Sequence, residues 1–343
     1  MAERSVEDWL WWSTTAGARV ARVLLAPFSA LFAVIVWMRN ALYDLRVLPV
    51  RAPRLPALSV GNLTVGGTGK TPVSSWLATR LESRGARPAI VLRGYGDDEP
   101  LVHARLTPSI PIIVNANRLE AIERAAAAGA DVAVLDDAFQ HRRVARTADV
   151  VLVSADVPND PERMLPTGPF REPSTSLRRA SLVIVTRKAA PLERARALVA
   201  HVNLVAPGVR TAIVHLALEA VHFEGSPPAA LASISGRRVL AIAGVGNGAA
   251  FGEQLRQAGA IVRTRVYPDH HPFAAADAQS LARDLVPDEI ALCTLKDVVK
   301  LLPLWPRAAP AIGYVSQAVI VEEREEAIDA ILDLVIDARL RQL

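Results

Sequence analysis

The chain has 343 residues, which suggests two domains or one large α/β domain with additions. Hydrophobic residues make up 51% of it, which excludes a disordered chain, and a formal net charge of +4 is too small to imply nucleic-acid binding. The single cysteine, Cys293, excludes a disulfide framework and fits a reducing compartment.

The first distinctive segment is apolar. Sixteen uncharged, mostly apolar residues lie between Arg22 and Arg39, with arginines and tryptophans on both sides. A span of a bilayer needs about 20 apolar residues, so this run is short. Arginine and tryptophan beside an apolar helix are typical of a lipid headgroup interface. We expect 1–45 to form a helical segment that lies in a membrane leaflet, with a spanning helix and a buried core helix as alternatives.

Residues 61–72, GNLTVGGTGKTP, lie between an expected strand at 55–60 and an expected helix at 71–84. In such a P-loop the glycines let backbone N–H groups converge on β- and γ-phosphates, Lys70 reaches them, and the Thr71 hydroxyl can bind Mg²⁺. The strict pattern has glycine where this chain has Thr64. The chain has only four lysines against 35 arginines, so a lysine here indicates a position where a compact ammonium is required. The predicted nucleotide-binding residues are Thr64, Val65, Gly66, Gly67, Thr68, Gly69, Lys70 and Thr71.

Buried strands then alternate with helices. Further strands are expected at 88–92, 110–114, 131–135, 148–154 and 181–186, and a helix at 118–128. Continuous β-branched runs joined through helices indicate a parallel sheet with both faces covered. The predicted fold is therefore α/β: a P-loop NTPase-like, doubly wound, mostly parallel sheet. We expect a kinase core at 46–190, a smaller α/β domain at 191–322 that closes over the nucleotide, and a helix at 323–343 that packs back on the core.

Acidic residues follow two of the expected strands. Asp136 and Asp137 close the strand at 131–135, where a kinase places its magnesium-organising carboxylate, although they could instead cap the next turn. The acidic run 97–99 comes after RGYG, in an expected loop that faces the same crevice. A kinase needs a group that takes the proton from the acceptor hydroxyl. An acidic surface loop explains this run equally well.

Three other polar groups are candidates. The run 140–143, QHRR, offers donors and positive charge near the phosphates, and Arg171 in the loop 165–173 can present a planar fork to a phosphate. Solvated surface groups are the alternative for both. In the second unit, 269–271 reads Asp-His-His, which fits a histidine paired with a catalytic aspartate or a simple helix-entry loop.

Taken in order, these motifs resemble the tetraacyldisaccharide 4′-kinase family of lipid A synthesis. The resemblance rests on GNLTVGGTGKTP, RGYG followed by DEP, DDAFQHRR, LPTGPFREP, AIAGVGN, YPDHHPF and TLKD, which span 61–297. It implies transfer of the ATP γ-phosphate to the 4′-hydroxyl of a tetraacyldisaccharide 1-phosphate, with Mg²⁺, at the cytoplasmic face of the bacterial inner membrane. The implied partners are this lipid and the membrane surface, without nucleic acid, and we expect a monomer.

The resemblance also implies roles for single residues. Asp98 would be the base, His270 would orient it, and Lys70 would complete the catalytic set. Mg²⁺ would be held by Thr71, Asp136 and Asp137. The acceptor-binding residues would be Asn62, Arg93, Gly94, Tyr95, Gln140, His141 and Arg171.

Two other classes of protein share the P-loop. A membrane-recruited switch ATPase of the partitioning type carries a signature lysine just before the paired glycines, and this chain has Val65 there. A GTPase or metallochaperone needs a base-reading motif such as Asn-Lys-x-Asp, and 183–188 supplies Lys188 without the aspartate. Both alternatives predict hydrolysis without a lipid acceptor.

Overall fold

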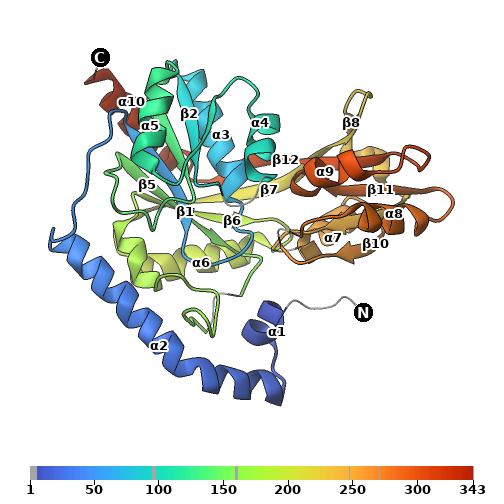
Figure 1. Ribbon diagram of the computed structural model, residues 1–343, viewed down its shortest axis with the longest axis horizontal. Coiled ribbons are helices and arrows are strands. Elements are labelled where there is room, and N and C mark those ends of the chain that lie inside the picture. Colours follow the sequence, from blue (N-terminus) through green and yellow to red (C-terminus); the bar gives the residue numbers. More distant parts are fainter. Residues whose placement is uncertain (1–5, 95–97, 159–160, 247, 270, 343) are drawn as a thin grey trace.

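The protein is built on one continuous sheet. The structure is a computed structural model that describes residues 6–94, 98–158, 161–246, 248–269 and 271–342. Within these residues, twelve strands form a sheet in the order β10-β9-β11-β12-β7-β6-β5-β1-β4-β2-β3, and β8 pairs with β7 (Figure 1). All neighbours along this order run parallel except β7 and β12, which are antiparallel. The predicted α/β fold with a mostly parallel sheet is confirmed.

The first half of the chain forms the core of this sheet. Its strands are β1 (Ala57–Asn62), β2 (Pro88–Leu92), β3 (Ile112–Val114), β4 (Val132–Asp136), β5 (Ala148–Ser154) and β6 (Leu182–Arg187). Every residue of β1, β2 and β4 is buried, as expected of apolar parallel strands covered on both faces.

Helices cover both faces of the core. One face holds α3 (Lys70–Ser83) and α10 (Glu325–Leu340), which bury leucines and isoleucines against the strands in a single apolar cluster. The other face holds α5 (Arg118–Ala127), the 3₁₀ turn η1 (Ser174–Arg179) and α6 (Leu192–Val205). Each fully buried leucine on these helices contributes about 2 kcal/mol to folding. The sheet is therefore doubly wound, as predicted.

The rest of the sheet belongs to what we call the second lobe. It contains β8 (Ala229–Ala230), η2 (Leu231–Ile234), β9 (Arg238–Ala243), α7 (Gly248–Gln257), β10 (Ile261–Val266), α8 (Ala275–Arg283), β11 (Glu289–Thr294), α9 (Leu295–Leu301) and η3 (Leu302–Leu304). Helix α7 covers one face of its strands, and α8 and α9 cover the other. Two long strands, β7 (Arg210–Phe223) and β12 (Ile312–Glu323), pair with each other and join this lobe to the core.

An apolar helix lies outside the sheet. After α1 (Val6–Trp12), α2 (Ala16–Asp44) runs along the lower edge of the core in Figure 1. Among the described residues, α2 is the one helix long and apolar enough to cross a membrane by length and composition. Its Ser29 hydroxyl donates to the Met164 carbonyl at 2.6 Å, and its Arg39 pairs with buried Glu172 at 2.7 Å. The predicted N-terminal apolar helix is confirmed.

One element differs from the sequence prediction. The structure has a helix, α4 (Asp98–Leu106), where we expected the loop after RGYG to continue through residue 100. Its first turn carries Asp98 and Glu99, whose negative charges stabilise the positive end of the helix dipole. Asp98 and Glu99 therefore begin a helix and do not belong to a surface loop.

Candidate active site

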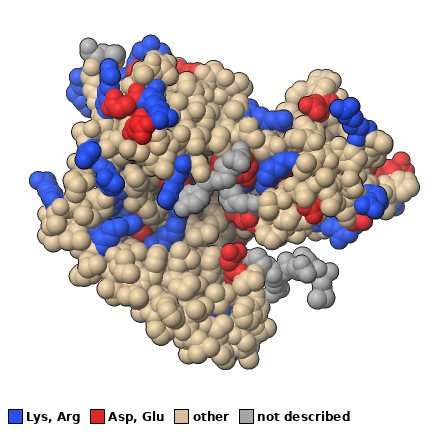
Figure 2. Space-filling model, viewed as in Figure 1, with Lys and Arg blue, Asp and Glu red and all other residues tan. Residues whose placement is uncertain are grey.

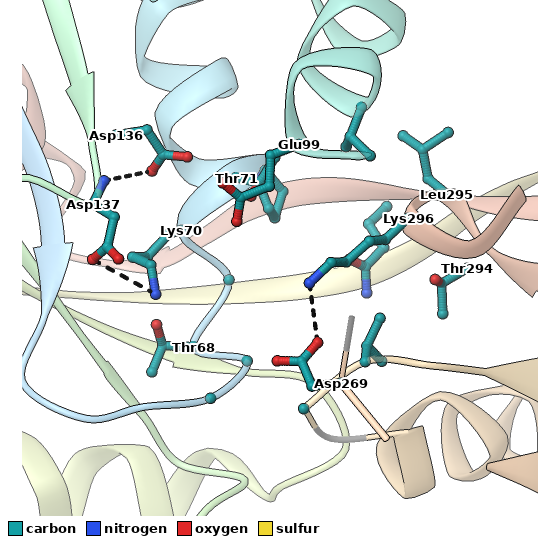
Figure 3. A pocket seen from close by; sticks show the side chains of 18 of the residues that line it. Thr68, Lys70, Thr71, Glu99, Asp136, Asp137, Asp269, Thr294, Leu295 and Lys296 are labelled. Atoms are coloured by element: carbon teal, nitrogen blue, oxygen red, sulfur yellow. Dashed lines mark hydrogen bonds and ion pairs between the residues drawn. The ribbon is translucent and has the colours of Figure 1, made fainter. Parts of the chain in front are cut away.

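A cavity of about 920 Å³ lies between the carboxyl ends of the core strands and the second lobe. Figure 2 shows basic and acidic side chains meeting at this hollow. Its core wall consists of the P-loop, the ends of β2 and β4, and the loops that follow them, and its other wall comes from the second lobe. Figure 3 labels ten of the residues that line it: Thr68, Lys70, Thr71, Glu99, Asp136, Asp137, Asp269, Thr294, Leu295 and Lys296.

The P-loop is held in shape by buried hydrogen bonds. The Asn62 amide donates to the Thr68 hydroxyl at 2.9 Å, and the Thr186 hydroxyl donates to the Thr68 carbonyl at 2.9 Å. Gly69 begins α3 with φ 88°, in the left-handed region that glycine adopts without strain. The loop thus directs the N-terminus of α3, with its unpaired N–H groups and partial positive charge, at the cavity.

Lys70 and Arg171 converge on one carboxylate. The Lys70 ammonium lies 3.9 Å from Asp137 Oδ1 and 3.3 Å from Asn62 Oδ1. The Arg171 guanidinium donates to both Asp137 oxygens, at 2.9 and 3.1 Å, and also to Asn62. Burial alone would raise the pKa of Asp137, but Lys70 and Arg171 more than offset it and lower the pKa to about 2. Asp137 is therefore ionised at neutral pH, within reach of the P-loop lysine (Figure 3).

The backbone of Asp137 is strained. Its φ is 47°, in the left-handed region, where a residue with a Cβ pays about 1 kcal/mol. Strain of this kind is concentrated at functional sites, where the surrounding structure holds it in place. Here the strain turns the second of two consecutive carboxylates toward the P-loop.

Asp136 is fixed by different partners. Its carboxylate is almost fully buried at the end of β4, where Oδ1 accepts the Asp137 N–H at 3.0 Å. Its other oxygen lies 3.0 Å from Nε2 of His103, a fully buried residue of α4. Sequence reasoning missed His103, because nothing in the local pattern distinguishes it from an ordinary residue of a short helix.

The two aspartates and Thr71 suit Mg²⁺. Within the described residues, no group of three or more histidine, cysteine and acidic side chains could by itself hold a metal ion. Magnesium does not need one, because it is usually held by one or two carboxylates together with phosphate oxygens and water. Thr71, Asp136 and Asp137 line the cavity at the P-loop and supply only oxygen ligands, as Mg²⁺ prefers.

The predicted base, Asp98, is not among the residues that line the cavity. Asp98 is 5% exposed at the start of α4, and its Oδ2 lies 3.5 Å from the Lys300 ammonium of α9. The neighbouring Glu99 points into the cavity, opposite Thr71 (Figure 3). Two of the predicted residues, Tyr95 and His270, lie outside the described residues.

The predicted acceptor residues divide into two groups. Arg93, Gln140, His141 and Arg171 line the cavity. Burial and the nearby arginines, Arg118 first among them, lower the pKa of His141 to about 4, so this ring is neutral at pH 7. A neutral ring can still donate a hydrogen bond to an anion that the arginines attract.

The other predicted residues do not line the cavity. Asn62 is fully buried beneath the P-loop, where its amide donates a hydrogen bond to Thr68 and stabilises the conformation of the loop. Thr64 pairs with Phe170 on the far side of the loop, and Gly94 is exposed with φ 85°.

Comparisons with known proteins show the family of this chain. The model of one protein family, described as tetraacyldisaccharide-1-P 4′-kinase, matches residues 21–336. The chain belongs to this family. It is 38% identical to the tetraacyldisaccharide 4′-kinase of Anaeromyxobacter dehalogenans (strain 2CP-1 / ATCC BAA-258), over 96% of this chain and 94% of the relative. The kinase of the same name from Syntrophus aciditrophicus (strain SB) is 36% identical, over 84% and 87% of the two chains.

A solved structure shares the fold. The crystal structure of LpxK from Aquifex aeolicus in complex with ATP superimposes with a TM-score of 0.71 at 26% identity, covering 92% of this chain and 99% of the other. These matches confirm the predicted family and the predicted class of enzyme, a kinase with an alcohol group as acceptor. Neither a switch ATPase nor a GTPase is needed to explain the chain.

The 4′-kinase site also contains basic residues that sequence reasoning missed. Arg39 of α2 and Arg118 of α5 line the cavity together with Lys188 and Lys296. Lys188 is partly buried, and desolvation lowers its pKa; its ammonium lies 3.5 Å from the Gly67 carbonyl of the P-loop. Three of the four lysines of the chain, Lys70, Lys188 and Lys296, thus line this one cavity, and the fourth, Lys300, contacts Asp98. The rarity of lysine, which singled out Lys70, was a signal for Lys188 and Lys296 as well.

Proposed function

We propose that the protein transfers the γ-phosphate of ATP to the 4′-hydroxyl of a tetraacyldisaccharide 1-phosphate, a step of lipid A biosynthesis, with Mg²⁺ and at the cytoplasmic face of the inner membrane. The names of its relatives, and the ATP in the related crystal structure, support the nucleotide and the acceptor. The observation that carries the proposal is Arg39: an arginine of the apolar helix α2 lines the same cavity as the P-loop lysine.

Helix α2 suits a membrane surface. Its outward side exposes large apolar side chains, at 58 to 72% of their surface: Val20, Val23, Leu24, Phe28, Leu31 and Trp37. Figure 2 shows the lower part of the molecule, where α1 and α2 lie, as almost free of charged side chains. A soluble protein rarely exposes a contiguous apolar surface of this kind without a partner. We infer that α2 lies in the membrane leaflet that also holds the acceptor.

Contacts between α2 and the core give an amphiphilic acceptor a route to the phosphates. Arg39 and Asn40 of α2 both bind the buried carboxylate of Glu172, at 2.7 and 3.1 Å. Burial alone would raise the pKa of Glu172, but Arg179 and Arg39 lower it. The next residue toward the N-terminus is Arg171, which binds Asp137 in the cavity. An acceptor whose acyl chains remain beside α2 can thus place its sugar among Arg39, Arg171 and His141.

The proposed chemistry assigns each group one role. Asp98 takes the proton of the 4′-hydroxyl, whose oxygen forms a bond to the γ-phosphorus while the bond to the bridging β–γ oxygen breaks and ADP leaves. Lys70 and the N-terminus of α3 stabilise the negative charge of the transferred group. Thr71, Asp136 and Asp137 would hold Mg²⁺, which neutralises phosphate charge when bound. His270 would orient Asp98.

We also propose how the parts are organised. Residues 1–45 attach to the membrane, 46–190 form the kinase core, 191–322 form the lobe that closes over the nucleotide, and 323–343 pack back on the core. The proposed unit is a monomer.

The first test follows the phosphate. Purified protein is incubated with γ-labelled ATP and Mg²⁺, with and without tetraacyldisaccharide 1-phosphate in detergent. Label that moves to the lipid supports the proposal, whereas free phosphate that is unaffected by the lipid contradicts it.

The second test addresses the membrane. The double substitution of Leu24→Glu and Phe28→Glu should release the protein from vesicles that contain anionic lipid, measured by sedimentation. Leu334→Glu is the matched control, because Leu334 is a 41% exposed leucine on α10, away from α2. Release by the control, or retention of the double variant, would mean that another surface binds the membrane.

A further inference from the structure

A buried histidine joins three elements behind the proposed metal site. His103 of α4 is fully buried. Its Nδ1 lies 2.7 Å from the Ser75 hydroxyl of α3, and its Nε2 lies 3.0 Å from Asp136 Oδ2 at the end of β4. Ser75 is also buried, at 3% exposure. The P-loop helix, α4 and the strand that carries the acidic pair are therefore joined through one imidazole.

The chemistry of the partners sets the direction of each hydrogen bond. A carboxylate oxygen can only accept, so Nε2–H donates to Asp136. A neutral imidazole carries one N–H, so Nδ1 accepts from the Ser75 hydroxyl. The other Asp136 oxygen accepts the Asp137 N–H at 3.0 Å. Both oxygens of Asp136 are thus fixed in direction, and each keeps a lone pair.

We propose that His103 is a positioning residue, which holds the Asp136 carboxylate in the orientation that receives Mg²⁺. This inference rests on the proposed function, in which Asp136 helps to hold the ion. Partners of this kind, one shell behind the ligands, typically change metal affinity 10- to 100-fold when they are removed. Without His103, the buried oxygen Oδ2 would lack its donor, and the carboxylate would turn to find another.

The same residue links the metal site to the proposed base. Helix α4 begins with Asp98 and carries His103 a little more than one turn later. Because His103 fixes α4 to the end of β4, it also fixes the position of Asp98 relative to Asp136. A loss of the hydrogen bond to Asp136 should therefore disturb magnesium binding first and proton transfer second.

Two amide substitutions distinguish a role of His103 in positioning Asp136 from a role in packing alone. The amide nitrogen of His103→Gln can occupy the place of Nε2 and donate to Asp136, because both nitrogens lie three bonds from Cβ. The amide of His103→Asn reaches only the place of Nδ1, so it can keep Ser75 but not Asp136. Both variants bury one amide in place of the ring, so they form a matched pair.

The experiment measures the dissociation constant of ATP with and without Mg²⁺ at constant ionic strength, together with the melting temperature of each variant. For His103→Asn we expect the gain in ATP affinity that Mg²⁺ provides to fall by about 10-fold, and the Mg²⁺ concentration for half-maximal turnover to rise by about the same factor. For His103→Gln both values should stay within about threefold of the wild type. If His103→Asn does not fold, Ser75→Ala should cause a smaller change in the same direction.

Three results would overturn the inference. The first is an unchanged magnesium dependence in His103→Asn, and the second is an equal loss in both amide variants that follows their melting temperatures. The third, if Ser75→Ala has to replace His103→Asn, is an unchanged magnesium dependence in Ser75→Ala. A wild type whose ATP affinity does not respond to Mg²⁺ would instead contradict the proposed metal site itself. The wild-type measurement therefore separates a failure of the proposed function from a failure of this inference.

Discussion

The two walls of the cavity are built differently. On the core wall, Lys70, Asn62, Asp137 and Arg171 bind one another directly, and they come from the P-loop and from loops that follow adjacent strands of one hydrogen-bonded sheet. The second lobe lines the cavity with residues of α7 and α9 and of the turns after β9 and β10, and Lys296 pairs there with Asp269 of its own lobe at 3.0 Å. The core wall is thus held together by contacts among its own side chains.

The walls meet where α4 packs against α9 and where the turn after β9 approaches the P-loop. Lys300 of α9 approaches Asp98 of α4, and Gly246 packs against the P-loop so closely that an added Cβ would lie 2.7 Å from the Gly67 nitrogen. In the proposed mechanism, phosphate and metal binding belong to the core wall, and the second lobe completes the site from the opposite side. Substitutions on each wall test these separate roles.

Lys70→Ala should have the largest effect. Positioning and charge stabilisation supply most of the catalysis in phosphoryl transfer, so we expect turnover to fall by at least about 10³-fold. The measurement is transfer of γ-labelled phosphate to the lipid acceptor. Substantial remaining turnover would contradict the assignment of the core wall as the phosphate site.

Asp98→Asn should lower kcat by about 10² to 10⁴-fold while ATP binding persists, because a general base contributes about this much. Glu99→Gln is the matched control, since Glu99 is the next residue of the same turn and faces the cavity. Steady-state kinetics of both variants shows which of the two carboxylates acts as the base. A larger loss in Glu99→Gln would transfer the role of base to Glu99.

Gly246→Ala should separate the two walls without changing the core wall. A methyl group there must push the lobe away from the backbone of Gly67, and a displacement of about 1 Å can cost up to about 10²-fold in rate. Gly252→Ala is the control, because its Cβ would meet Thr264 within the same lobe. Equal losses of kcat/KM in both variants would indicate general damage to the lobe.

Lys296→Ala should raise the KM for ATP by about tenfold, which corresponds to the loss of one charge-assisted contact. Lys296→Arg tests the size of the group, because a chain with 35 arginines has kept a lysine here. We expect arginine to restore only part of the affinity. Full restoration would mean that the charge alone matters, and an unchanged KM in Lys296→Ala would remove this lysine from the nucleotide site.

The smallest effect concerns pH and stability. The pKa of Asp137 is about 2 in the folded protein, below its unfolded value near 4, so its ion pairs stabilise the fold above pH 4. That contribution is lost as the pH falls toward 2. Because Asp137 is 40% exposed, the gap in unfolding free energy between wild type and Asp137→Asn should be at most about 1 kcal/mol at pH 7. Denaturant titrations at pH 7 and at pH 2.5 measure how much smaller this difference in unfolding free energy becomes at the lower pH. A difference that stays constant would contradict a stabilising role of the ion pairs.

Much of the fold could be predicted because its strands are continuous apolar runs. The expected strands at 148–154 and 181–186 match β5 and β6 closely. Helix α4 was not predicted, because RGYGDDEP has the composition of a loop and the helix depends on contacts with α3 and α9.

The site could be predicted where residues follow one another along the chain. Lys70, Asp136 and Asp137 belong to contiguous motifs, and the structure brings them together. Arg39 and His103 depend on tertiary contacts across 133 and 33 positions of the chain, which no local pattern reveals.

The long β7–β12 pair has a consequence for how the chain folds during synthesis. In the sequence, 88 residues separate the end of β7 at Phe223 from the start of β12 at Ile312. Helix α10 follows β12 and covers the face of the sheet that α3 also covers. The apolar cluster under the P-loop helix therefore stays open until the ribosome has made α10, long after α2 has emerged. A nascent chain with that cluster exposed is prone to aggregate. Early attachment of α2 to a membrane would keep unfinished chains apart until the kinase core closes.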